Sequence, residues 1–72
     1  MDWEIAEQVL FKMSSVYAQD NLRKLTFNAE IYPLLLRFQN EERTQELYDS
    51  IFKIEKALMK NINQDTDDDR FL

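Results

Sequence analysis

Residues 22–38 read LRKLTFNAEIYPLLLRF, and this stretch decides the fold of the chain. Its apolar residues recur at the three- and four-residue spacing of an α-helix, but they fall into two sets. The first stripe consists of Leu22, Leu25, Ala29, Tyr32 and Leu36. The second stripe, on roughly the opposite side of a helical wheel, consists of Phe27, Ile31, Leu34, Leu35 and Phe38. A helix that is apolar on two sides has to be covered on two sides.

Pro33 is the one proline of the chain and lies inside this helical pattern. A proline cannot donate a backbone hydrogen bond to the carbonyl four residues earlier, which here belongs to Ala29. The apolar spacing nevertheless continues past Pro33. We therefore expect one middle helix over about residues 22–38, kinked at Pro33.

Amphipathic helices are predicted on both sides of this segment. The first covers about residues 3–18 and begins after Asp2, a favourable N-cap residue. Its apolar face is formed by Trp3, Ala6, Leu10, Met13 and Tyr17. The third covers about residues 41–63 and is predicted to begin after Asn40 as its cap. Its apolar face is formed by Leu47, Ile51, Ile54, Leu58 and Ile62.

The chain contains no glycine, no cysteine and no histidine. Without glycine, tight hairpin turns and phosphate-binding loops lose the residue that forms them most readily, and helix is the structure that remains. Without histidine and cysteine, disulfides, thiolate or imidazole metal sites and histidine-activated nucleophiles are excluded. We therefore expect an all-α protein that is not an enzyme and has no catalytic, cofactor or metal site.

The architecture that these segments predict is a single domain over residues 1–63. It is a small three-helix bundle, or a helical hairpin plus one helix. Residues 64–72 carry four aspartates and one arginine and show no helical periodicity, so we expect a disordered acidic tail. The Asp-rich run there lacks the glycine and the final glutamate of a calcium-binding loop.

The charge of the chain argues against some classes of partner. Its net charge is −5, which disfavours nonspecific binding to nucleic acid or to an anionic membrane. No apolar run approaches the ~20 residues that span a bilayer, so no membrane partner is expected. The first residues lack the basic start of a signal peptide, and we expect a cytoplasmic protein.

Self-association is expected because a domain of this size buries only about 60% of its unfolded surface. We predict that the second stripe of the middle helix is covered by another copy of the chain in a homodimer. The predicted interface residues on that stripe are Phe27, Ile31, Leu34 and Phe38. Phe11 is a further candidate, because it lies outside the apolar face of the first helix among polar residues.

The sequence predicts an acidic helical module that acts by binding another protein through apolar helix faces, as an adaptor, inhibitor or regulator. The alternative is a dimeric regulator that binds nucleic acid. Its phosphate contacts would come from Lys53, Lys56 and Lys60, which fall on one outer face of the third helix.

Overall fold

The computed structural model describes the backbone of residues 1–71 and the side chains of residues 1–60. The elements in chain order are α1 (Trp3–Tyr17), α2 (Asn21–Thr26), the π-helical segment η1 (Phe27–Ile31), α3 (Tyr32–Gln39) and α4 (Gln45–Phe71). The prediction of an all-α fold is confirmed, and no strand occurs in the described backbone.

Aspartate side chains cap the first two helices of the chain. The side chain of Asp2 accepts a hydrogen bond from the backbone N–H of Ile5 at 3.2 Å, which caps α1. The side chain of Asp20 accepts one from the N–H of Arg23 at 2.8 Å, which caps α2. These side chains satisfy backbone donors that have no partner within their helices, and so they set where α1 and α2 begin.

The middle helix runs without a break through α2, η1 and α3, that is, over residues 21–39. The π-helical segment directly precedes Tyr32 and Pro33, where the proline lacks a donor for the preceding turn. A π turn holds more residues than an α turn, so the side chains after it lie at other positions around the helix than an unbroken α pattern predicts. The kink at Pro33 stays a prediction.

The connection to α4 corrects the predicted start of the third helix. Asn40 ends α3 instead of capping α4, and Glu41 takes a left-handed conformation with φ 68°. The N–H groups of Glu41 and Glu42 bond to carbonyls of the last turn of α3, both at 3.0 Å, which is a Schellman ending. Thr44 caps α4, since its hydroxyl accepts from the N–H of Leu47 at 3.2 Å. The prediction missed this because both Asn and Thr are good caps.

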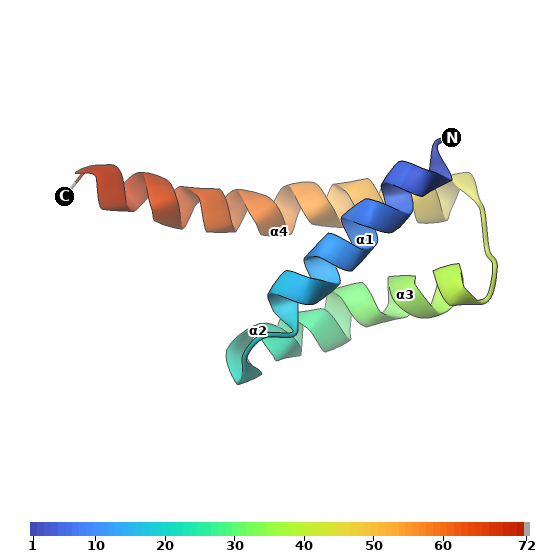
Figure 1. Cartoon of the computed structure of the whole chain (residues 1–72), viewed down its shortest axis with the longest axis horizontal. Helices are drawn as coiled ribbons and strands as arrows, with labels where there is room; N and C mark the ends of the chain where they lie inside the picture. The colour runs from blue at the N-terminus through green and yellow to red at the C-terminus, as the bar shows by residue number, and fades with distance from the viewer. Residues whose placement is uncertain (72) are drawn as a thin grey trace.

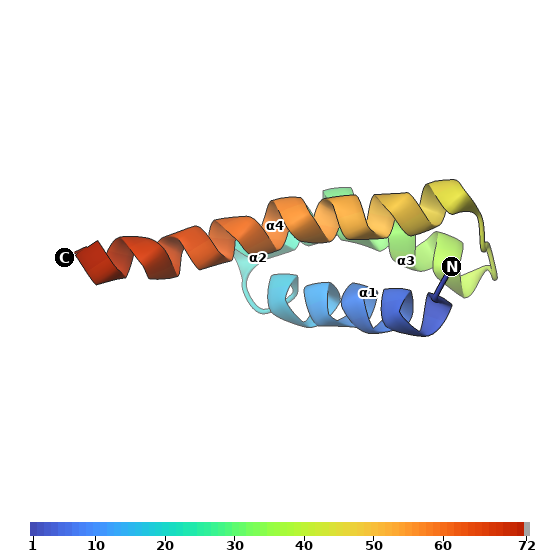
Figure 2. The same ribbon diagram turned by 90° about the horizontal axis from the view of Figure 1, so that it is seen from above.

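The three helices pack as an antiparallel pair with a third helix across it. The middle helix and α4 run in opposite directions, joined by the loop at residues 40–44, and α1 lies across one face of the pair (Figures 1 and 2). α4 extends past the other helices (Figure 1). Its 27 residues correspond to a length of about 40 Å.

The core lies where α1 meets the pair. Its buried side chains are Ala6, Leu10, Met13 and Tyr17 from α1, Ile31, Leu34 and Phe38 from the middle helix, and Leu47 and Ile51 from α4. The backbone of α4 is helical to Phe71, past the predicted end of the third helix at residue 63. The side chains of residues 64–72 lie outside the described part of the chain, and the predicted disorder of that tail and the domain limit at residue 63 stay predictions.

Candidate protein-interaction surface

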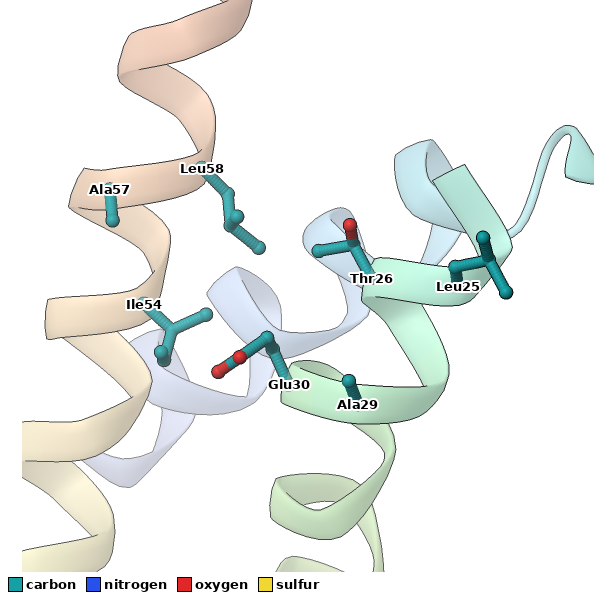
Figure 3. Close-up of a pocket in the computed structure, with 7 residues that line it drawn as sticks. All are labelled: Leu25, Thr26, Ala29, Glu30, Ile54, Ala57 and Leu58. Atoms are coloured by element: carbon teal, nitrogen blue, oxygen red, sulfur yellow. The ribbon is translucent and has the colours of Figure 1, made fainter. Parts of the chain in front are cut away.

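A groove lies between the middle helix and α4, with a volume of about 470 Å³. The groove is lined by Leu25, Thr26, Ala29 and Glu30 from the middle helix and by Ile54, Ala57 and Leu58 from α4. Figure 3 shows these two walls facing each other, with α1 behind them. The groove therefore opens on the face of the helix pair that α1 does not cover.

Small side chains keep the groove open. Ala29 and Ala57 lie in opposite walls, where a larger residue would fill the space. Behind them, the hydroxyl of Tyr17 donates a hydrogen bond of 2.9 Å to the backbone carbonyl of Leu58, which ties the end of α1 to α4. The wall formed by α4 is thereby held in place by α1.

Glu30 is the one charged residue that lines the groove. Its side chain points across the groove toward Ile54 (Figure 3), and it takes part in no ion pair among the described residues. An apolar groove with one carboxylate suits an apolar partner surface that carries a cation nearby.

Leu25 lines the groove and Leu22 lies one helical turn before it on α2, and these two are the most exposed large apolar side chains of the described residues. Leu22 is 79% exposed and Leu25 is 68% exposed. Leu25 points away from α4 (Figure 3). No residue of α2 is buried. We call Leu22 and Leu25 the α2 leucine pair. Together with the groove they form a continuous apolar surface of the kind that marks a contact site.

The structure corrects the predicted interface on the middle helix. Ile31, Leu34 and Phe38 are buried against α1 and α4 of the same chain, so another copy cannot cover them. Phe27 is half-buried, with its ring 6.2 Å from the ring of Tyr32. The sequence shows two apolar stripes on the middle helix, and either stripe is apolar enough to face a core. Only the packing of α1 decides which of the two stripes is buried.

The first stripe is the exposed one. Besides the α2 leucine pair, it contains Ala29, Tyr32 and Leu36, all of which are exposed. Phe11 on α1 is 51% exposed, as its position outside the apolar face predicted. Phe11 is not among the groove residues, and its part in a contact stays a prediction from the sequence.

A polar cluster closes the other end of the bundle. The guanidinium of Arg37 donates to the carboxylate of Glu42 through Nε at 3.0 Å and to that of Glu46 through Nη2 at 2.7 Å. The bond from Arg37, reinforced by one from the hydroxyl of Thr44, holds the pKa of Glu42 below its usual range. These contacts tie the loop to both helices that it joins.

Arg43 covers the apolar end of the core. Its guanidinium lies 3.8 Å from the ring centroid of Phe38 and 5.2 Å from that of Trp3. The Trp3 ring in turn meets Tyr48 edge-on at 5.3 Å. Cation–π and aromatic contacts of this kind stabilise the closed end.

The predicted basic ridge lies on α4. Lys53, Lys56 and Lys60 are all exposed, and none of them is in an ion pair with a described residue. A second hollow on α4 is lined by Phe52, Glu55, Lys56, Met59 and Lys60. The lysines are thus available to an anionic group.

Comparison with known proteins finds no match to a family model, a curated protein or a solved structure. Within the described part of the chain no acidic cluster is arranged to hold a metal ion, and no helix has the length and hydropathy of a membrane span.

Proposed function

We propose that this protein is a small helical interaction module, acting as an adaptor, inhibitor or regulator. It binds another protein chain through the groove and the α2 leucine pair and carries out no chemistry of its own. The observation that carries the proposal is that two largely exposed leucines accompany an apolar groove on a chain this short. Large apolar side chains in contact with water gain free energy when a partner covers them.

The size of that gain follows from the exposed fractions. Complete burial of a leucine contributes about 1.5–3 kcal/mol, so covering Leu22 and Leu25 contributes roughly 2–4 kcal/mol per chain. The groove walls add area to this. Association costs an estimated 4–15 kcal/mol, so the surface suits a modest and reversible affinity.

The simplest partner is a second copy of the chain, which makes the protein a homodimer. The α2 leucine pair and the groove supply apolar area for this interface. A cytoplasmic location remains a prediction from the sequence.

The test compares two aspartate substitutions by sedimentation and by capture of partners from cell extract. Leu25→Asp alters the proposed surface, and Phe11→Asp makes the same chemical change at an exposed site on α1. We expect Leu25→Asp to abolish association and Phe11→Asp to leave it intact. If neither substitution changes any association, the proposal is wrong.

A second candidate function is nucleic-acid binding through Lys53, Lys56 and Lys60. It is favoured by the exposure of all three lysines without an ion pair to a described residue. The net charge of −5 opposes it. A gel shift that falls steeply between 50 and 200 mM salt, and that is lost on replacing the three lysines by glutamine, would support this function over the first.

A further inference from the structure

We propose that the occupant of the groove is the α2 leucine pair of a second copy of the chain. The two copies are related by a two-fold axis, so that each inserts Leu22 and Leu25 into the groove of the other. This inference rests on the proposed interaction function and specifies the partner and the mode of docking.

Self-complementarity is the first argument for a second copy. A two-fold interface uses the same surface on both subunits, so that surface must contain both the projecting and the receiving part. Here Leu22 and Leu25 project from α2, and the hollow between Ala29 and Ala57 lies beside them. A single two-fold rotation then places the leucine pair of each copy in the groove of the other copy.

The groove has enough volume for the leucine pair. Two leucine side chains contain eight carbon atoms, which together occupy roughly 240 Å³ if each carbon takes the ~30 Å³ of a water molecule. The groove has about 470 Å³. It can therefore receive both side chains together with part of the helix that carries them. A bulky residue at Ala29 or Ala57 would remove that space.

The condition of α2 is the second argument. It forms the first part of the middle helix, and none of its six residues is buried. On one side α2 continues into η1, but its apolar side has no cover within its own chain. A second copy is the one partner that is present wherever this protein is made.

Charge agrees with this docking mode. α2 carries two cations, Arg23 and Lys24, between its leucines, and the groove carries one carboxylate, Glu30. Inserting α2 therefore brings positive charge toward a groove of negative charge. Two acidic surfaces would repel each other at the same distance.

The test uses two variants that damage different halves of the contact. The knob variant, Leu22→Asp, changes an exposed side chain that is not among the groove residues. The groove variant, Ala57→Lys, places a positive charge in the receiving wall, and lysine is a good helix former. Circular dichroism checks that both variants stay folded.

Sedimentation velocity at a concentration where the natural chain is dimeric gives the outcome. Each variant alone should be monomeric, with its dimer dissociation constant raised at least about 100-fold. An equimolar mixture should dimerise more strongly than either variant alone, because one of its two contacts is natural and the other sets the introduced aspartate against the introduced lysine. Phe11→Asp should dimerise like the natural chain.

A covalent measurement checks the same geometry. The chain has no cysteine, so a chain with Leu22→Cys mixed with a chain with Ala57→Cys can form one mixed disulfide only. We expect this product to outweigh the one from Phe11→Cys mixed with Ala57→Cys several-fold. Dimers that survive in both variants, or a mixture that stays monomeric, would overturn the docking mode. A natural chain that stays monomeric would overturn self-association, while partner capture that depends on Leu25 would still support the interaction function.

Discussion

The assignment of the core side of the middle helix can be tested with a matched pair of substitutions, Ile31→Ala and Leu25→Ala. Ile31 is fully buried, and a buried isoleucine shortened to alanine costs about 2–5 kcal/mol of unfolding free energy. Leu25 is 68% exposed, so the substitution removes only about a third of the free energy that full burial of a leucine contributes. That fraction corresponds to roughly 0.5–1 kcal/mol.

Urea unfolding at low micromolar protein, followed by circular dichroism and by the fluorescence of Trp3, measures both values. Trp3 is the one tryptophan of the chain and packs against Tyr48, so its emission reports on the closed end of the bundle. Ile31→Ala should lower the midpoint by more than about 1 M urea. It should also lower the thermal midpoint by at least about 8 °C.

Leu25→Ala should change the urea midpoint by a few tenths of 1 M. A repeat at ten times the protein concentration separates folding from association, because only an associating species has a midpoint that depends on concentration. If Leu25→Ala costs as much as Ile31→Ala at the lower concentration, the core side of the middle helix has been assigned wrongly.

Four further predictions follow from local features. Replacing Glu41, which has φ 68°, by glycine should raise the free energy of unfolding by up to about 1 kcal/mol in chemical denaturation, because glycine takes a positive φ without strain. The pKa of Glu42 is lowered in the folded state, so its contribution is present above the usual pKa near 4.5 and is lost as the pH falls through the lowered value; Glu42→Gln should flatten the stability curve in that range. Tyr17→Phe removes the bond to the α4 carbonyl and should cost about 1 kcal/mol in urea unfolding, whereas no loss would show that the bond contributes nothing. Removing residues 64–72 should leave the thermal midpoint within about 2 °C if that tail is disordered, and a larger drop would show that it packs on the body.

The sequence alone determined the fold class and the helix count. The absence of glycine and the apolar spacing of three segments predict an all-α chain, and the structure has that class. Asp2 marked the start of α1 correctly, because a cap acts within a few residues of sequence. Local interactions of this kind can be read without knowing what the helix packs against.

The start of α4 could not be predicted from the neighbouring residues alone. Asn40 and Thr44 both suit an N-cap, and the sequence offered no ground for preferring the second. The left-handed Glu41 and the bonds from Arg37 to Glu42 and Glu46 place the start at Gln45. Such a loop is specified by contacts with both of the helices that it joins.

Only the tertiary structure decided which side of the middle helix is core and which is surface. Both stripes are apolar, so hydrophobicity does not distinguish them, and the π-helical segment η1 turns the side chains after it away from the simple pattern. The packing of α1 buries Ile31 and leaves Leu25 in water. The groove depends on the same packing, because Ala29 and Ala57 are distant in sequence and face each other only after the helices have paired. The physical reason is that burial is a property of the whole assembly of helices, whereas periodicity is a property of each helix alone.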